Sequence, residues 1–311
     1  MDKKPVIIDC DTGTDDAIAI IAALYSPELD VRAFTTVAGN VELQYTSQNT
    51  LNLVRYLGFD IPVSVGAEKP ILRPGIIHTG NKTHGDTGLG TVSLPAADAE
   101  FDQRNAVELI YEEAVRWGGE LELIPVGPLT NIAHAVMVYP QLKDLVRRIT
   151  FMGGSMIGGN VTTTSEFNIW SDPEAARIVL ASGIPLTMVG LDVTTRAVLN
   201  REDEEAIRSI GSDAAVFSAD ILEFMFKRNK KGGEDALMHD ALAVGVCINP
   251  LLVTQKEYFV DCECEGKYTS GHTFVAVTNI FKGKPNCSVA ETLDLAAFKK
   301  WLIGALKRSA N

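Results

Sequence analysis

The chain has 311 residues, of which 46% are hydrophobic and 22% are charged, so it can form a sizeable apolar core and lacks the composition of a disordered protein. Its formal net charge is −12, and its basic residues form no run longer than a pair such as Lys230-Lys231. These features argue against a nucleic acid or an anionic membrane surface as partner, and they leave a small-molecule ligand open.

The first residues, MDKKPVIID, place charges directly before a short strand-like run. The sequence has no apolar run of membrane length and no recognisable secretory signal. Its five cysteines are an odd, scattered set, which argues against a disulfide framework. We therefore expect reduced thiols and a cytoplasmic protein.

Strand-like and helix-like segments alternate along most of the chain. Five such pairs follow one another, at 5–9 and 15–26, 31–39 and 41–58, 121–127 and 128–139, 149–154 and 172–183, and 185–192 and 200–210. The strand candidates are continuously apolar, as expected for parallel strands that helices cover on both faces. This order predicts a doubly wound, mostly parallel α/β sheet flanked by helices.

The C-terminal third reads differently. Residues 213–250 are mostly helical in pattern, 257–289 resemble late strands, and 293–306 form an amphipathic closing helix. The sequence contains no convincing repeat or Pro/Ser-rich linker, so we expect residues 1–311 to form a single domain.

Polar or glycine-rich residues follow all five strand candidates. They are the acidic segment at 9–16, TVAGN at 36–40, PVGPLTN at 125–131, FMGG at 151–154 and GLD at 190–192. Because the carboxyl ends of parallel strands meet at one edge of a sheet, we expect these segments to converge on one rim.

The acidic segment holds four aspartates, Asp9, Asp11, Asp15 and Asp16, between two apolar elements. Capping of the following helix explains one or two of them but not all four. Carboxylates this close repel one another in a desolvated place, whereas a hard divalent cation is bound by such oxygens. The segment therefore predicts a metal site.

Three familiar acidic or phosphate-binding loops each lack a defining residue here. An EF-hand counted from Asp9 would need a carboxylate where Ile20 stands, and a Walker A loop needs Gly-Lys-Ser/Thr. A haloacid-dehalogenase-type phosphatase has Asp-x-Asp-x-Thr, but Gly13 occupies the threonine position.

A fourth pattern fits. DCDTGTDDAIAI at 9–20 resembles the N-terminal signature of the calcium-dependent nucleoside hydrolases, D-x-D-P-G-x-D-D-A, with Thr12 where that family usually has proline. Similar blocks follow in family order: TVAGN (36–40), HGDTGLG (84–90), PVGPLTNIA (125–133), FMGG (151–154), EFNIWSDPEAA (166–176) and MHDALAV (238–244). The resemblance spans nearly the whole chain. It implies a Rossmann-like single domain that hydrolyses the N-glycosidic bond of ribonucleosides to free base and ribose.

The resemblance also implies one Ca²⁺ per subunit, held by Asp11, Asp16, Asp240 and the backbone carbonyl of Val126. All are hard oxygen donors, as Ca²⁺ requires, and two ribose hydroxyls and a water would complete the shell. Asp11 would take the proton from the attacking water, and His239 would protonate the leaving base.

Further positions match substrate contacts of the family. Asp15 would bind ribose hydroxyls, and His84 lies on a glycine-rich loop that would cover the base. Other matches are Asn40, Met152, Asn160, Glu166 and Asn168, and the aromatic candidates for the base are Phe167, Trp170, Phe224 and Phe226. Taken singly, Glu166 and Asn168 also fit a solvated loop, and Asn160 also fits a turn.

The base preference stays open. Lys227 and Lys231 stand where pyrimidine-preferring relatives carry Gln and Tyr, so inosine, uridine and cytidine all remain candidate substrates. Two alternative functions also remain: a haloacid-dehalogenase-type phosphatase and a non-catalytic, Ca²⁺-dependent nucleoside-binding protein. By analogy with the family we expect a homotetramer or a homodimer.

Overall fold

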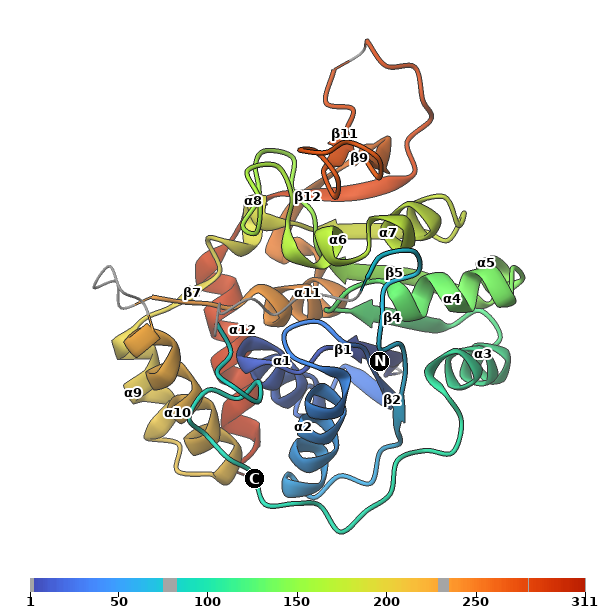
Figure 1. Ribbon diagram of the computed structural model, residues 1–311. Helices are drawn as coiled ribbons and strands as arrows, with labels where there is room; N and C mark the ends of the chain where they lie inside the picture. Colours follow the sequence, from blue (N-terminus) through green and yellow to red (C-terminus); the bar gives the residue numbers. More distant parts are fainter. Residues whose placement is uncertain (1–2, 75–82, 229–234, 279, 311) are drawn as a thin grey trace.

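The computed structural model describes residues 3–74, 83–228, 235–278 and 280–310. Its central sheet has eight strands in the order β3-β2-β1-β4-β5-β6-β12-β9 (Figure 1). Every neighbouring pair is parallel except β12 with β9. The strands are β1 (Lys4–Cys10), β2 (Leu29–Thr36), β3 (Val63–Val65), β4 (Leu121–Pro125), β5 (Val146–Met152), β6 (Leu186–Val189), β9 (Val253–Tyr258) and β12 (Cys287–Leu293). The predicted mostly parallel, doubly wound sheet is confirmed.

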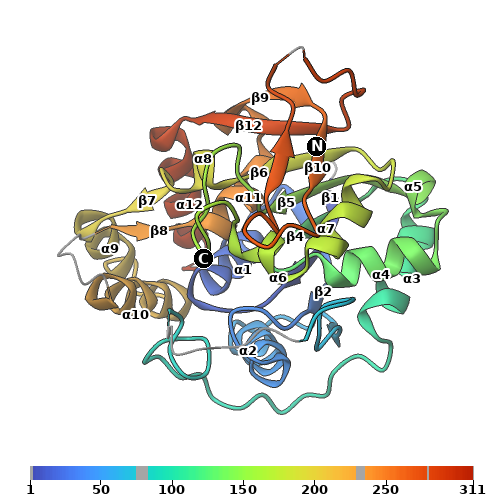
Figure 2. The ribbon, with the colours of Figure 1, turned by 45° about the horizontal axis from the view of Figure 1, so that its top comes forward.

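Helices cover both faces of this sheet (Figure 2). One apolar core contains α1 (Thr14–Leu24), α2 (Leu43–Tyr56), α11 (His239–Ile248) and α12 (Leu295–Arg308); the other contains α3 (Ala106–Trp117), α4 (Thr130–Val138), α5 (Leu142–Leu145) and α7 (Pro173–Leu180). In β1, Val6, Ile8 and Cys10 face the first core, and Ile7 faces the second. Both faces are buried, which is why β1 reads as an unbroken apolar run.

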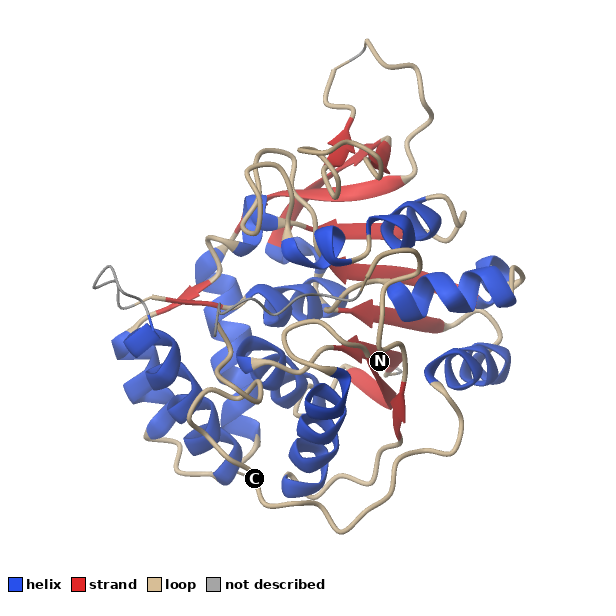
Figure 3. Ribbon diagram, viewed as in Figure 1, coloured by secondary structure: helices blue, strands red, loops and turns tan. Residues whose placement is uncertain are grey.

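Several smaller elements surround the sheet (Figure 3). The helices α9 (Arg201–Arg208) and α10 (Asp213–Arg228) pack outside α1 and α12. Two short antiparallel pairs, β7 (Val198–Leu199) with β8 (Ala236–Leu237) and β10 (Val260–Cys262) with β11 (Thr273–Val275), lie apart from the main sheet. The remaining pieces are α6 (Phe167–Ser171), α8 (Leu191–Thr194) and the 3₁₀ turn η1 (Pro250–Leu252).

The structure adds elements that the alternation did not predict. The strand β3 and the helix α3 lie in 59–120, for which the sequence analysis assigned no element. The start of α3 does carry a signal: the Asn105 side chain accepts from Glu108 N, and the Glu108 carboxylate accepts from Asn105 N. This reciprocal cap is a known helix start.

Two further expectations concern the chain as a whole. Within the described ranges, no helix is both long and apolar enough to cross a membrane. The five cysteines, all within those ranges, are unpaired, in agreement with the expected absence of a disulfide framework.

Candidate active site

The segments that follow β1, β2, β4 and β5 converge at one edge of the sheet and line a cavity of about 330 Å³. The base-recognition candidates aside, all of the predicted catalytic, substrate-contact and metal-ligand residues line it except Asp11 and Asp16, which are buried. The lining ones are Asp15, Asn40, His84, Val126, Met152, Asn160, Glu166, Phe167, Asn168, His239 and Asp240. Parallel strand order therefore brings together residues that lie more than 200 positions apart in the chain.

The turn from β1 into α1 is organised around Asp16. Its carboxylate accepts hydrogen bonds from the backbone N–H groups of Gly13 (2.9 Å) and Asp11 (3.2 Å), and from the side chain of Asn40 (2.9 Å). Asp16 thus satisfies N–H groups that precede the helix, which is the capping role considered for it from the sequence. It also presents a carboxylate to the site.

Glycine at position 13 is required by close approach. A Cβ atom there would lie 2.5 Å from His84 Nδ1 and 2.7 Å from Asn40 Nδ2. These distances are shorter than any tolerable contact, so a side chain at Gly13 would displace both groups from the cavity.

Thr12, the departure from the family signature, is buried and hydrogen-bonded. Its hydroxyl lies 2.7 Å from the hydroxyl of Thr50 on α2, and its carbonyl accepts from Asn49 Nδ2 at 3.2 Å. A proline would offer no hydroxyl. In this chain the turn is therefore tied to α2 by side-chain hydrogen bonds.

Asp11 lies beneath the cavity between two glycines. Its Oδ2 accepts from Asn40 N at 2.7 Å. A Cβ on Gly39 would lie 2.0 Å from Oδ2, and one on Gly127 would lie 2.8 Å from Oδ1. Burial, and secondly the charge of Asp16, raise the pKa of Asp11 well above its usual range.

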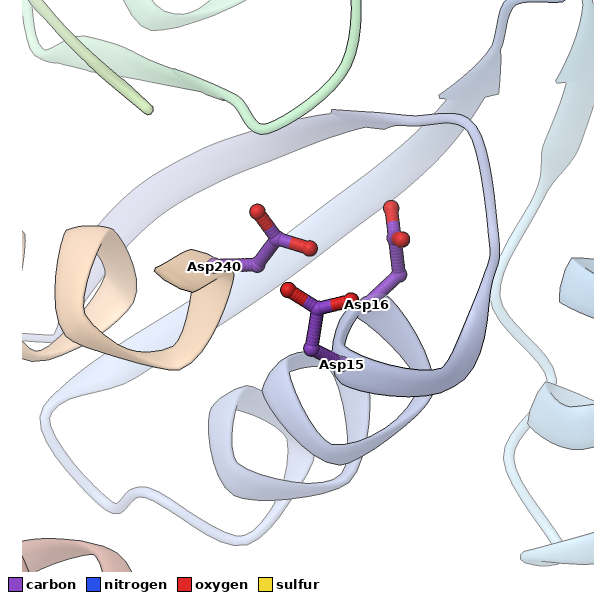
Figure 4. A group of neighbouring side chains, drawn as sticks. All are labelled: Asp15, Asp16 and Asp240. Carbon is purple, nitrogen blue, oxygen red and sulfur yellow. The ribbon is translucent and has the colours of Figure 1, made fainter. Parts of the chain in front are cut away.

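Three carboxylates form a compact cluster. Oxygen atoms of Asp15, Asp16 and Asp240 all lie within 4.8 Å of one another (Figure 4). Asp15 and Asp16 extend from the first turn of α1, and Asp240 extends toward them from the first turn of α11. All three are buried. The cluster therefore contains Asp15, expected at the ribose, in addition to two of the expected metal ligands.

This cluster fits a divalent cation. Burial, and then the neighbouring carboxylates, raise the pKa of Asp240 well above its usual range and that of Asp16 to about 6. Such raised values mean that ionised carboxylates repel one another here when no cation compensates them. The donors are all oxygens, which is the set that hard cations such as Ca²⁺ and Mg²⁺ take.

Asn168 connects two strand ends. Its Nδ2 donates to Val126 O at 2.7 Å, after β4, and to Met152 O at 3.1 Å, at the end of β5. The same group lies 3.3 Å from Met152 Sδ. Asn168 is buried and its side chain is held by these hydrogen bonds, so the solvated-loop interpretation considered for it does not hold.

Glu166 is buried at the start of α6, where its carboxylate accepts from the backbone N–H groups of Gly154, Asn168 and Ile169 at 2.9–3.2 Å. Burial raises its pKa, and these hydrogen bonds oppose that shift. Asn160 Oδ1 accepts from Phe167 N at 2.9 Å. Both residues therefore line the cavity from positions that local hydrogen bonds fix. Glu166 is buried, so the solvated-loop interpretation does not hold for it, whereas Asn160 is exposed in the bend after Gly158-Gly159, which is compatible with the turn interpretation.

Two histidines line the cavity, and a threonine contacts Nδ1 of each. Thr14 N donates to His84 Nδ1 at 3.1 Å, so the proton of the neutral His84 ring resides on Nε2. The Nδ1 of His239 lies 2.8 Å from the hydroxyl of Thr194, on α8. Burial lowers the pKa of His84 to about 4 and also lowers that of His239.

Asp9 supports the site from below. Its Oδ1 accepts from the Thr35 hydroxyl (2.5 Å) on β2 and from Asn131 Nδ2 (2.7 Å) on α4. Its Oδ2 is buried and has no hydrogen-bond partner within the described ranges. Burial raises the pKa of Asp9 to about 7. Cys10 lies on the opposite face of β1 and packs in the first core.

The base-recognition candidates need correction. Lys227 is exposed and pairs with Glu223, with Nζ 2.7 Å from Oε1, and Phe226 is buried in the first core; neither lines the cavity, and neither does Phe224. Lys231 lies outside the described residues. The sequence reasoning missed five lining residues: Thr83, Val161, Met225, Arg228 and Leu237. Trp170, named as an aromatic candidate, does line the cavity.

Comparison of the sequence with known proteins identifies nucleoside hydrolases as its relatives. A sequence model of the inosine-uridine preferring nucleoside hydrolases matches residues 6–300. The pyrimidine-specific ribonucleoside hydrolase RihA of Escherichia coli strain K12 is 40% identical over 307 residues, covering 97% of this chain and 98% of that protein.

Solved structures agree. A purine-preferring ribonucleoside hydrolase from Gardnerella vaginalis superposes with a TM-score of 0.93 at 33% identity, covering 99% of both chains. An inosine-guanosine nucleoside hydrolase superposes with a TM-score of 0.90 at 28% identity, covering 97% of this chain and 98% of the other. These relatives differ in the bases that their names give, so the names alone assign no base to this chain.

Proposed function

This chain belongs to the inosine-uridine preferring nucleoside hydrolase family and is a ribonucleoside hydrolase, and we propose that it works with one bound Ca²⁺ per subunit and with a histidine as general acid. The family assignment excludes the phosphatase alternative. The observation that carries the metal part of the proposal is the buried carboxylate cluster of α1 and α11, two members of which line the cavity. The reaction is nucleoside plus water giving free base plus ribose.

The proposed metal ligands are Asp11, Asp16, Asp240 and the carbonyl oxygen of Val126. When bound, Ca²⁺ supplies the positive charge that orients the 2′- and 3′-hydroxyls of ribose and lowers the pKa of the attacking water. The carboxylate repulsion described above supports a cation at this place, and the all-oxygen donor set suits Ca²⁺.

We assign Asp11 as the base that takes the proton of the attacking water. Its position between Gly39 and Gly127 supports this role, because no side chain of either residue separates its carboxylate from the neighbouring strand ends. Asn40 N holds one of its oxygens at 2.7 Å, which fixes the orientation of the carboxylate.

The ribose contacts of the proposal lie around the cluster. They are Asp15, Asn40, Met152, Asn160, Glu166 and Asn168, all of which line the cavity. Cleavage of an N-glycosidic bond builds positive charge on the sugar, as in other glycoside hydrolysis. Buried carboxylates beside the sugar stabilise that charge as it develops.

The leaving base takes the electron pair of the C1′–N bond and needs a proton. We assign His239 as its donor and His84, with Phe167, as contacts that cover the base. His84 is held as the Nε2–H tautomer by Thr14 N, so it offers a neutral hydrogen-bond donor and no proton for transfer near neutral pH.

The proposal is tested by initial rates on the common purine and pyrimidine nucleosides, with added CaCl₂ and with a chelator. We expect ribose release with Ca²⁺ and its loss, by more than about tenfold, with the chelator. Activity that the chelator leaves unchanged would contradict the metal assignment, and a panel without any turnover would contradict the proposed function.

A further inference from the structure

The cavity is lined by charges of both signs in unequal number. Its carboxylates are Asp15, Glu166 and Asp240, whereas Arg228 is the one lysine or arginine that lines it among the described residues. In the proposed mechanism, these carboxylates bind the ribose or the metal ion. It leaves the guanidinium of Arg228 unused.

Arg228 reaches the cavity from the last turn of α10. Met225 lies three positions earlier, on the same helix face, and also lines the cavity, together with Leu237 of β8. Of the two residues between them, Lys227 is exposed to solvent and pairs with Glu223. Arg228 therefore lines the cavity together with apolar residues of its own helix and of β8, and such a lining suits a base better than a hydrated sugar.

Hydrogen bonding fixes the guanidinium. Its Nη1 donates to the backbone carbonyl of Thr83, which links α10 to the loop that carries His84. A guanidinium has five N–H donors in a planar fork, so this one bond does not exhaust them. Arg228 is held in place without losing its capacity to bind a ligand oxygen.

The charge of Arg228 affects the pKa of both histidines of the cavity. Burial lowers the pKa of Arg228 and Asp15 opposes this, but a guanidinium stays protonated at any working pH. After burial and Asp15, the charge of Arg228 is the next influence on the pKa of both His84 and His239, and it lowers both. The cation thus lies close to the groups that the proposed function places at the base.

We propose that Arg228 is the residue that recognises the base: its guanidinium donates to a carbonyl oxygen of the base and stabilises the negative charge that forms there when the C1′–N bond breaks. This inference rests on the proposed function. When the bond breaks, its electron pair stays on the base and spreads onto the carbonyl oxygens, so this hydrogen bond strengthens toward the transition state. The proton that finally neutralises the base comes from His239.

The chemistry selects a substrate class. Uracil and hypoxanthine present carbonyl oxygens, whereas adenine carries an amino group where hypoxanthine has its oxygen. Two donors cannot pair, so the N–H groups of Arg228 that face the base would lack an acceptor at this position of adenine, which costs free energy where water is excluded. The hydrogen bond to Arg228 would therefore account for a preference for ribosides of oxo-bases over adenosine, in line with the inosine and uridine of the family's name.

The test compares inosine with adenosine in the wild type, Arg228→Met and the matched control Lys227→Met. The wild type is expected to prefer inosine by about tenfold or more in kcat/KM, which corresponds to one charged hydrogen bond. Arg228→Met should lose roughly 10- to 100-fold on inosine, keep its rate on adenosine within about threefold, and so lose the preference. Lys227→Met should match the wild type on both.

Arg228→Met also breaks the bond to Thr83, so the ratio of the two substrates is the decisive readout. Equal losses on inosine and adenosine, or no loss on either, would overturn the inference, since a merely structural role affects both substrates alike. Arg228→Lys, which keeps the charge, should retain part of the preference. If the wild type hydrolyses no nucleoside, the proposed function fails, and calorimetric binding of hypoxanthine against adenine to wild type and Arg228→Met still decides the role of Arg228.

Discussion

Each histidine of the cavity is oriented by one threonine, but the two contacts differ in consequence. The N–H of Thr14 can only donate, so His84 Nδ1 accepts and the ring stays neutral. The Thr194 hydroxyl can donate or accept, so it tolerates both protonation states of His239. His239 therefore has a neighbour compatible with giving and regaining a proton, whereas the Thr14 N–H favours the neutral form of His84.

His239→Ala should slow uridine and inosine by about 10²- to 10⁴-fold, because their bases leave poorly without a proton. It should spare 4-nitrophenyl riboside, whose leaving group needs none. The measurement is kcat on both kinds of substrate, with His134→Ala on α4, away from the cavity, as control. Equal losses on both substrates would refute the assignment of His239 as acid.

Asp15 and Asp240 belong to one cluster but have different proposed partners. Asp240→Asn should weaken Ca²⁺ binding by at least about tenfold, because it removes a ligand. Asp15→Asn removes an equal charge from the same cluster but, in the proposal, a ribose ligand, so it should weaken Ca²⁺ binding less. Isothermal titration with CaCl₂ measures both, and the reverse order would exchange the two roles.

At the residue scale, the sequence alone located the aspartates that lie together in the structure but did not identify the residue of α10 that lines the cavity. In a dense local motif such as DCDTGTDD, the relative positions of the aspartates are fixed by the turn and the helix start, which lie within the same dozen residues. The choice between Lys227 and Arg228 depends on the rotation of α10 on its neighbours. One position along a helix turns the side chain by about 100°, and only tertiary packing fixes that angle.

At the scale of elements, the site depends on the junctions between strands and helices. The hydroxyl pair Thr12–Thr50 ties the turn after β1 to α2, and Asp9 ties β1 to β2 and α4. These contacts involve residues next to the proposed metal ligands and not the ligands themselves. They hold the ends of the strands at fixed distances from one another.

Thr12→Val should lower the free energy of unfolding by about 1–2 kcal/mol, because it leaves the buried hydroxyl of Thr50 without that partner. Thr254 offers a matched control: its hydroxyl lies 2.7 Å from that of Thr292, the same separation, but the pair is exposed. Thr254→Val should cost less than about 0.5 kcal/mol. Urea unfolding measures both variants, and equal costs would contradict the role given to Thr12.

The raised pKa of Asp9 leads us to expect that the free energy of unfolding depends on pH. Burial raises its pKa to about 7 in the folded protein, so between its ordinary value and pH 7 the folded state binds more protons than the unfolded state. Its contribution to stability is therefore present at low pH and is lost as pH rises through this window, by an amount on the order of 4 kcal/mol.

Asp9→Asn removes this titration at a pH-independent cost. Relative to the variant, the wild type should be more stable at pH 5 than at pH 8. Urea unfolding at both values, with a chelator present throughout, measures the difference. A difference that does not change with pH would mean that Asp9 keeps its charge in the folded protein.

Element prediction from sequence was reliable where elements are long and apolar. The five predicted strand–helix pairs all match observed elements, because continuous burial on both faces leaves an unmistakable run. The three residues of β3 are too few to show a period. The pairing of β9 with β12, and its antiparallel direction, depend on how distant parts of the chain are arranged in the sheet. No local pattern in the sequence encodes them.

On the scale of the whole molecule, the proposed Ca²⁺ should couple the site to global stability. An ion that binds only the folded state raises stability by an amount that grows with its concentration above Kd, about 2.7 kcal/mol at a hundredfold excess. We expect the melting temperature to rise with CaCl₂ and to fall when a chelator is added. Asp240→Asn should reduce this response, and an equal response in the variant would place the ion elsewhere.

The association of subunits stays a prediction. The resemblance to the family implies a homotetramer or a homodimer, and sedimentation of the purified protein decides between them and a monomer.

The position of the carboxylates in the chain has a consequence for biosynthesis. Two members of the cluster belong to the first strand–helix junction, and the third arrives with α11, on the order of two hundred residues later. While the ribosome is still making the middle of the protein, the nascent chain exposes Asp15 and Asp16 without Asp240. A truncated product that ends before α11 would therefore carry the whole N-terminal signature and still lack Asp240, one ligand of the proposed Ca²⁺ site.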